Sequence, residues 1–263
     1  MHNPKTATGE RPVVLITGAA QRLGRHMALA LAERGWDVMA HYRSSKDKAE
    51  ATLQRLRGYG GHHCIAQADL SSEAETRQLF EHCVQQMGRV DAIVNNASLF
   101  LYDDTATFTT DRLKEHMLPN LAAPIVLSQA FHQYLVAQDT EARGVIVNLL
   151  DQKLSNPNPD FLSYTLSKSA LKTATLLMAK AMAPHLRIVG VSPGLTLPSH
   201  MQTDESFEKA HRHAPLGAAS TPSDITKAVV FMLESPSITG VDLVVDGGQH
   251  LVGMERDFSM MEF

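Results

Sequence analysis

Short apolar runs alternate along the chain with amphipathic segments. Runs rich in β-branched residues predict strands, and apolar positions at helical spacing predict the helices between them. The predicted strands cover residues 13–17, 36–42, 63–68, 92–94, 144–149, 186–191 and 240–245. The predicted helices cover 22–33, 46–57, a segment that begins after Ser72, 110–137, 164–182 and 223–233. This alternation predicts an α/β fold of three layers, with a mainly parallel sheet of seven strands.

Three features interrupt this rhythm. Pro119 and Pro124 lie in the fourth predicted helix, and since proline removes a backbone donor they should bend or break it near Asn120. Segment 195–215 combines prolines, charges and histidines, which predicts a lid with some helix of its own. The tail 250–263 has no independent core, and we expect it either to dock on another subunit or to fray.

A glycine turn follows the first predicted strand. Residues 17–24 read T-G-A-A-Q-R-L-G and lead directly into a helix. Such a turn directs backbone N–H groups at a helix N-terminus toward a pyrophosphate, which makes Gly18, Leu23 and Gly24 candidates for cofactor binding. Arg22 stands where the common fingerprint has its central glycine. We expect its side chain to lie beside a bound phosphate or substrate.

The composition favours a protein whose binding partner is a small molecule. The 263 residues are 44% hydrophobic, which is enough for one domain spanning residues 1–263. A net charge of −4, 6% aromatic residues and no long basic run give nucleic-acid binding no support. No stretch reaches the roughly 18 apolar residues of a membrane helix. Two cysteines fit a reducing, cytoplasmic setting, and no metal site is predicted because the neighbours His62, His63 and Cys64 point to alternate faces of a strand.

Polar residues follow most predicted strands at the edge where parallel sheets bind ligands. They are Gly18 and Arg22 after the first strand, Arg43 after the second, Asp69 after the third, residues 95–98 after the fourth, Asp151 after the fifth, and Pro193 and Gly194 after the sixth. Each placement alone could be ordinary turn chemistry. Their coincidence at one edge predicts a binding site there.

The residue after the second strand indicates which cofactor binds. An acidic residue there accepts a hydrogen bond from the ribose 2′-hydroxyl, whereas a basic one pairs with a 2′-phosphate. Arg43, followed by Ser44, therefore predicts NADPH (NADP when oxidised).

Tyr164 and Lys168 are four residues apart on a predicted helix and so share a face. A nearby cation favours the phenolate, which predicts a lowered pKa for Tyr164 and a role in proton transfer. Asp151 lies thirteen residues earlier, and the helix bend brings Asn120 toward the same edge.

Together these motifs resemble the short-chain dehydrogenase/reductase family over nearly the whole chain. They are TGAAQRLG, Asp69-Leu70, NNAS at 95–98, Asn120, YTLSK at 164–168, SPG at 192–194 and VDGG at 245–248. The resemblance implies a Rossmann-like fold, a homotetramer, and a cofactor site that also includes Tyr42, Leu70, Asn96 and Ala97. It further implies that Tyr164 donates a proton, Lys168 binds the nicotinamide ribose and Asn120 holds a water.

Four features resemble the pteridine reductase branch of this family. They are Arg22, the run His41-Tyr42-Arg43-Ser44, Ser98 with Phe100, and Asp151 where the family usually has serine. This similarity implies a pterin held between nicotinamide and Phe100, with Arg22 and Ser98 at its polar edge. Asp151 and Tyr164 would share proton delivery to a C=N bond, in a substrate such as dihydrobiopterin, dihydromonapterin or dihydrofolate.

Two alternatives stay open. The chain could be a carbonyl reductase of the same family acting on an oxoacyl thioester, a quinone or a sugar. It could also be a non-catalytic NADPH-binding regulator, which the changed serine position would allow and which the intact Tyr164 and Lys168 oppose.

Overall fold

The computed structural model describes most of the chain. The described residues are 10–138, 141, 143–198 and 203–261. Among them, no helix combines the length and the apolar character that crossing a membrane requires.

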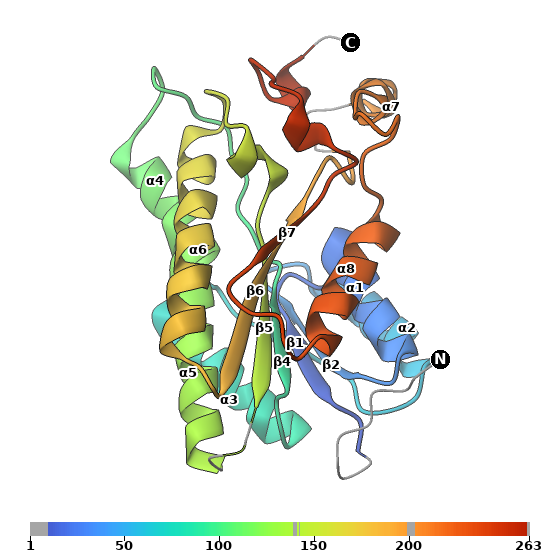
Figure 1. The fold of residues 1–263 in the computed structure, drawn as a ribbon. Helices are drawn as coiled ribbons and strands as arrows, with labels where there is room; N and C mark the ends of the chain where they lie inside the picture. The colour runs from blue at the N-terminus through green and yellow to red at the C-terminus, as the bar shows by residue number, and fades with distance from the viewer. Residues whose placement is uncertain (1–9, 139–140, 142, 199–202, 262–263) are drawn as a thin grey trace.

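Seven strands form one parallel sheet in the order β3-β2-β1-β4-β5-β6-β7 (Figure 1). The strands are β1 (Val13–Ile16), β2 (Asp37–Tyr42), β3 (Cys64–Gln67), β4 (Ala92–Asn95), β5 (Gly144–Leu149), β6 (Leu186–Pro193) and β7 (Asp242–Val245). The predicted Rossmann-like α/β fold is confirmed, and the sheet is parallel throughout. Because β1 pairs with both β2 and β4, the strand order reverses beside β1, where such sheets bind ligands.

Helices cover both faces of the sheet (Figure 1). One layer contains α1 (Arg22–Glu33), α2 (Lys46–Arg57) and α8 (Pro222–Glu234). The other contains α3 (Glu73–Met87), α4 (Thr110–Met117), α5 (Ala123–Gln138) and α6 (Leu162–Ala181). These crossover helices explain why the strands are apolar at almost every position, since neither sheet face is open to water.

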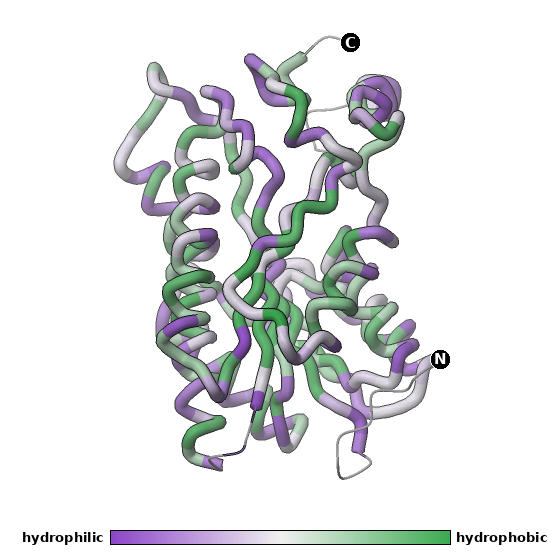
Figure 2. Tube along the Cα trace, in the orientation of Figure 1, coloured by the Kyte–Doolittle hydropathy of each residue, from purple (hydrophilic) through white to green (hydrophobic). Residues whose placement is uncertain are grey.

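Alternating side chains of each strand supply two separate cores. Val14 and Ile16 pack in the cluster beneath α1 and α8, whereas Val13 and Leu15 pack in the cluster beneath α3 and α5. Figure 2 shows hydrophobic residues along the central strands, with hydrophilic residues interspersed on the surrounding helices and at the end of the sheet where the C-terminal segment lies.

The fourth predicted helix is interrupted as its prolines suggested. A π-helical turn, η1 (Leu118–Ala122), separates α4 from α5 and contains Pro119 and Asn120. The irregular turn places Asn120 in a buried position, 1% exposed, facing the segment that follows β4. The break near Asn120 is therefore confirmed.

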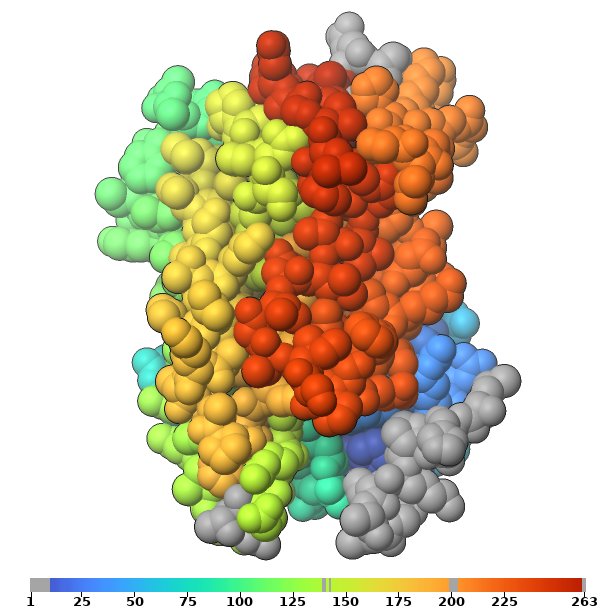
Figure 3. Space-filling model, viewed as in Figure 1, coloured from blue at the N-terminus to red at the C-terminus, as the bar shows by residue number. Residues whose placement is uncertain are grey.

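Two late segments lie beyond the carboxyl ends of the strands. The predicted lid 195–215 carries α7 (Asp204–Arg212), and its residues 199–202 lie outside the described part. The tail contains two short 3-10 turns, η3 (Gln249–Leu251) and η4 (Phe258–Met260). Figure 3 shows the red tail lying between the yellow-green segment near residue 155 and the orange α7. The described residues of the tail pack on their own chain and are not frayed. Docking of the tail on another subunit stays a prediction.

Candidate active site

The glycine turn has two residues in the left-handed region of backbone conformation. Gly18 has φ of +65°, and Arg22, at the first position of α1, has φ of +53°. This geometry explains why the common fingerprint has glycine at the position of Arg22, because a side chain is strained there. A Cβ at Gly24 would lie 2.6 Å from the amide nitrogen of Asn96, so glycine is needed for close packing.

Side chains from neighbouring strand ends hold this turn in place. The Thr17 hydroxyl accepts hydrogen bonds from the backbone N–H groups of Asn96 (2.9 Å) and Ala97 (3.0 Å). In return the Asn96 amide donates to the carbonyl oxygens of Thr17 (2.9 Å) and Gly18 (3.1 Å). The side chain of Asn96 and the backbone of Ala97 therefore support the turn itself.

His41 on β2 completes this support, a role that the sequence did not reveal. Its Nδ1 accepts a hydrogen bond from the Gly18 N–H at 3.1 Å, which leaves Nε2 to donate to the Ala68 carbonyl at 3.0 Å. Burial lowers the pKa of His41, which favours this neutral tautomer. The next residue, Tyr42, is 7% exposed and packs with Ala20 and Ala49.

The surroundings of the turn fit a dinucleotide that carries an additional phosphate. The N-cap residue of α1, Gln21, makes no side-chain capping bond, and the first helical turn has no acidic residue. Lys48 contacts Gln21 at 2.5 Å and adds positive charge. Arg43 and Ser44 are exposed at the end of β2, and within the described residues Arg43 has no carboxylate partner. Unsatisfied donors and unpaired cations of this kind suit phosphate groups.

Asp69 and Leu70 follow β3, and the hydrogen bonds of Asp69 are made within its own segment of the chain. The carboxylate of Asp69 accepts a hydrogen bond from the Ser71 N–H at 2.9 Å, and the backbone N–H of Asp69 donates to the Glu75 carboxylate at 2.7 Å. Leu70 is buried. Both therefore shape the loop that follows β3.

A cavity of about 330 Å³ opens beyond the carboxyl ends of β1, β4, β5 and β6. The predicted residues that line it are Arg22, Leu23, Asn96, Ser98, Phe100, Asp151, Tyr164, Lys168, Pro193 and Gly194. The structure does not bring the remaining ones into the cavity lining; they are Gly18, Gly24, Tyr42, Arg43, Ser44, Asp69, Leu70, Ala97 and Asn120. A second cavity of about 470 Å³, beside Lys172 and Asp242, holds none of these residues. The smaller cavity is therefore the candidate site.

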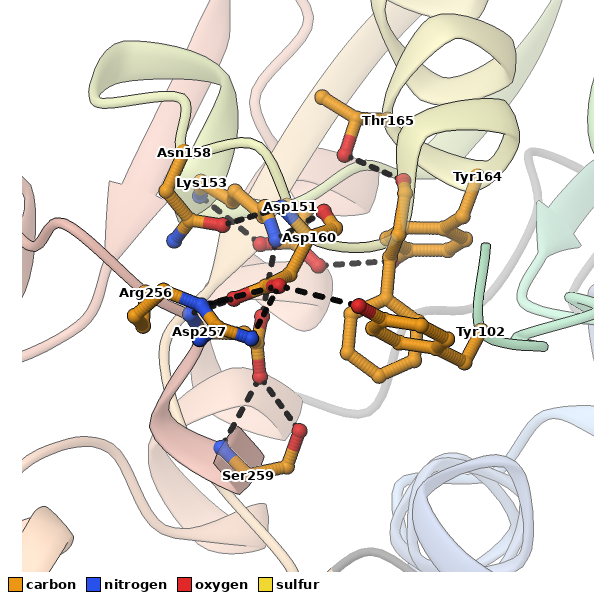
Figure 4. Close-up of polar contacts among 11 residues, drawn as sticks. Tyr102, Asp151, Lys153, Asn158, Asp160, Tyr164, Thr165, Arg256, Asp257 and Ser259 are labelled. Atoms are coloured by element: carbon orange, nitrogen blue, oxygen red, sulfur yellow. Dashed lines mark hydrogen bonds and ion pairs between the residues drawn. The ribbon is translucent and has the colours of Figure 1, made fainter. Parts of the chain in front are cut away.

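Asp151 and Tyr164 meet at one side of this cavity (Figure 4). The Tyr164 hydroxyl donates to Asp151 Oδ2 at 2.7 Å, and the Lys153 N–H donates to Asp151 Oδ1 at 2.8 Å. Burial and the adjacent Asp151 carboxylate raise the pKa of Tyr164 well above its ordinary value, and burial also raises the pKa of Asp151. The expectation that Lys168 lowers the pKa of Tyr164 was wrong for this state, because the carboxylate and burial dominate.

Lys168 is directed toward the sheet as well as the site. Its Nζ donates to the Leu149 carbonyl at 2.7 Å and lies 5.9 Å from the centroid of the Tyr164 ring. Burial lowers the pKa of Lys168 to about 8, and the charge of Asp151 acts in the opposite direction. The ammonium is thus fixed by the last carbonyl of β5.

Phe100 supplies an aromatic ring to the cavity, and the backbones of both neighbouring residues are held by hydrogen bonds. The Asn120 amide pairs with the N–H of Leu99 (2.7 Å) and its carbonyl (3.0 Å), and His116 accepts from the N–H of Leu101 at 3.2 Å. One face of the Phe100 ring stacks on Phe161, with centroids 4.1 Å apart.

The Phe100 segment also fixes the start of α6. Asp103 accepts hydrogen bonds from the backbone N–H and the hydroxyl of Ser163, and so caps the helix from another segment. Phe100 meets Tyr164 edge-on, with centroids 4.7 Å apart. The aromatic surface and the tyrosine hydroxyl are therefore held relative to each other.

Arg22 and Ser98 line the cavity from the segments that follow β1 and β4. The Arg22 guanidinium donates to the Pro198 carbonyl at 2.8 Å, which joins the glycine turn to the first part of the lid. The Ser98 hydroxyl is exposed and lies 3.3 Å from Asn120 Oδ1. Both residues therefore contribute polar groups to the cavity lining.

The sequence missed two charged residues of the site. Asp257 lines the cavity from the tail, and Lys153 is buried next to Asp151. The tail has no motif that could have indicated Asp257. The only indication for Lys153 was its position two residues after Asp151. Its burial depends on contacts with residues that lie far away in the sequence. Within the described residues no cluster of His, Cys, Asp and Glu could hold a metal ion.

Fold and site together define the class of α/β oxidoreductases that bind a dinucleotide at the carboxyl edge of a parallel sheet. The family model for short chain dehydrogenases matches residues 12–209. The chain therefore belongs to the short-chain dehydrogenase family.

Several known proteins resemble this chain along most of its length. Pteridine reductase 1 of Leishmania tarentolae is 32% identical, over 94% of this chain and 99% of its own. A 3-oxoacyl-(acyl-carrier-protein) reductase of Staphylococcus epidermidis is 27% identical, over 90% and 98%. The crystal structure of FolM alternative dihydrofolate reductase 1 from Brucella canis, complexed with NADP, is 36% identical, covers 92% of this chain and 95% of its own, and superposes with a TM-score of 0.85.

Proposed function

We propose that this chain is an NADPH-dependent reductase of a dihydropteridine C=N bond. The observation that carries this proposal is the 2.7 Å hydrogen bond from Tyr164 to Asp151 in a cavity lined by Phe100. Candidate substrates are dihydrobiopterin, dihydromonapterin and dihydrofolate. Similarity to a pteridine reductase and to an alternative dihydrofolate reductase supports this chemistry.

NADPH supplies the hydride when it is bound. Backbone N–H groups at the N-terminus of α1 would hold its pyrophosphate, with the Arg22 side chain beside it and directed mainly to the substrate. Arg43 and Ser44 would hold its 2′-phosphate, and Lys168 its nicotinamide ribose. The other residues proposed to shape this site are Gly18, Leu23, Gly24, Tyr42, Asp69, Leu70, Asn96, Ala97, Pro193 and Gly194.

Phe100 suits a flat heteroaromatic substrate. One face of its ring is covered by Phe161, so a pterin would lie against the ring surface that borders the cavity. Arg22 and Ser98 would bind the polar edge of the pterin. An aromatic surface with polar groups at its rim favours a ring substrate over an extended acyl chain.

Tyr164 and Asp151 would supply the proton. As the C=N carbon gains a C–H bond, the nitrogen takes the electron pair of the π bond and needs one proton, which Tyr164 donates. A protonated Asp151 then donates to the phenol oxygen and restores it. Burial raises the pKa of Asp151 and so favours the protonated form that this step requires. The family resemblance implies that Asn120 would order a water for resupply. Its side-chain amide is bonded to Leu99 and Ser167, which fixes its position beside the site.

The test is NADPH consumption by the purified protein with pterins, folates, oxoacyl thioesters, quinones and sugars. We expect turnover of a dihydropteridine, and Tyr164→Phe should lower kcat by about 10²- to 10⁴-fold while NADPH still binds. Turnover of carbonyl substrates alone would make the protein a carbonyl reductase. Tight NADPH binding without any turnover would favour a regulator.

We also propose a homotetramer. The family resemblance suggests it, and the outer surface of α6 exposes Leu166, Leu176 and Leu177 by 45%, 50% and 60%. Exposed apolar residues grouped on one helix are typical of an interface between subunits.

A further inference from the structure

Lys153 is a buried charge that the proposed reaction does not use. Its side chain is 4% exposed, and its Nζ donates to the Asp160 carbonyl at 2.7 Å and to Asp257 Oδ2 at 3.0 Å (Figure 4). The ammonium also lies over the Phe161 ring, 5.3 Å from its centroid. Burying a lysine is costly unless it is paired, so these contacts determine its position.

The C-terminal tail supplies the partner of Lys153. Arg256 contacts both carboxylate oxygens of Asp160, at 2.8 and 2.9 Å, and the Asp257 N–H donates to Asp160 at 2.8 Å. Asp257 in turn accepts from the N–H and hydroxyl of Ser259. Asp160 is thus the residue on which the tail is fastened beside the site.

Lys153 connects the tail to the Asp151–Tyr164 pair. Its backbone N–H donates to one oxygen of Asp151, and Tyr164 donates to the other. Its ammonium pairs with Asp257, which lines the same cavity together with Phe258 and Ser259. One lysine therefore contacts Asp151 through its backbone and the tail through its side chain.

We propose that Lys153 and Asp257 form a positioning pair, in which the tail holds Lys153 in place and the two opposite charges balance the electrostatic environment of Asp151. The C-terminal segment is then part of the active site of its own chain. This inference rests on the proposed function for the task given to Asp151, and it makes its own prediction about the carboxyl group.

Four charged or titratable groups face Asp151. Tyr164 and Lys168 come from α6, Lys153 comes from the turn after β5, and Asp257 comes from the tail. The charge of Lys153 lowers the pKa of Asp151, and the charge of Asp257 raises it. Removing one member of the pair should therefore shift the pKa of Asp151 in a direction that depends on which charge is lost.

The experiment measures the titration of Asp151 in the full-length protein by ¹³C NMR of labelled aspartate carboxyl groups. Asp151→Asn identifies the resonance. Lys153→Met should raise the pKa of Asp151 and Asp257→Asn should lower it, each by roughly half a unit or more. The double variant should return close to the wild-type value. Lys172→Met, which breaks the 2.9 Å pair with Asp242 beside the second cavity, is the matched control and should shift nothing.

Opposite shifts support the positioning pair. A tail that only shields the site would, in either variant, admit water and move the pKa in the same direction, and that result would overturn the inference, as would no shift at all. Because the NMR measurement needs no substrate, it distinguishes this failure from failure to reduce a pterin. If Lys153→Met does not fold, Asp257→Asn and Lys153→Arg, which keeps the charge, still test the sign.

Discussion

The two sides of the cavity are built differently. On the glycine-turn side, Thr17, His41 and Asn96 bond to backbone groups at the ends of neighbouring strands. On the carboxylate side, Asp151 accepts hydrogen bonds from Tyr164 and from the Lys153 N–H, and the buried Lys153 is paired with the charge of Asp257, 104 residues further along the chain. The first arrangement depends on the sheet, whereas the second depends on a tail with only two short turns of its own.

The two sides of the cavity should therefore differ in how well they tolerate substitutions. Backbone partners are present in any sequence that forms the sheet, so the glycine-turn side tolerates change in everything except a few small or hydrogen-bonding side chains. Paired side-chain charges can be lost by single substitutions, and each loss leaves a buried charge without a partner. We expect the first side to determine stability and cofactor binding, and the second to determine the proton chemistry.

The largest effect on the glycine-turn side should come from His41→Phe. It leaves the Gly18 N–H and the Ala68 carbonyl without their partner, at a cost of about 1–3 kcal/mol for each buried group. Chemical denaturation at pH 8 should show this loss, and NADPH binding should weaken with it. The exposed His62→Gln is the control. A variant as stable as wild type would mean that the turn does not depend on His41.

The same variant has a pH dependence with a definite sign. Burial lowers the pKa of folded His41, while the unfolded chain keeps the ordinary value of 6.5. The unfolded state therefore binds more protons below that value, and wild-type stability decreases as the pH falls through 6.5. Without His41 this part of the decrease disappears. The difference in the free energy of unfolding between variant and wild type should therefore be smaller at pH 5.5 than at pH 8.

Arg43→Ala should have the next largest effect and separates the cofactors. Losing charge-assisted hydrogen bonds to a 2′-phosphate should weaken NADPH binding about 10- to 100-fold and leave NADH binding nearly unchanged. Calorimetric titration of both nucleotides measures the ratio. Equal weakening would show that Arg43 acts on the shared part of the cofactor, and the NADPH preference would then need another residue.

The sequence predicted the glycine-turn side better than the carboxylate side for a physical reason. Strand-turn-helix patterns and the spacing of Tyr164 and Lys168 are local, so they survive without knowledge of the tertiary structure. The lowered Tyr164 pKa expected from Lys168 was wrong mainly because of burial, which spacing along the sequence does not show and which adds to the opposing effect of Asp151. The place of the tail was missed because Arg256 and Asp160 look like any other surface charges until the fold brings them together.

Arg22 lies on the glycine-turn side but lines the cavity that both sides share, and it gives the smallest but most discriminating test. Its backbone belongs to the glycine turn, with φ of +53°, while its guanidinium lines the cavity and donates to the Pro198 carbonyl of the predicted lid. Arg22→Ala should raise the KM for a dihydropterin about tenfold, as expected for one charge-assisted hydrogen bond, and change the Kd for NADPH by less than about threefold.

Arg22→Gly is the matched variant, because it removes the same guanidinium and relieves the strained backbone. If the guanidinium binds substrate, the alanine and glycine variants should lose pterin affinity equally, and glycine should be the more stable of the two. If instead only the alanine variant is impaired, or NADPH binding falls more than pterin turnover, Arg22 serves the turn alone. Steady-state kinetics, nucleotide titration and thermal unfolding of the three proteins distinguish these outcomes.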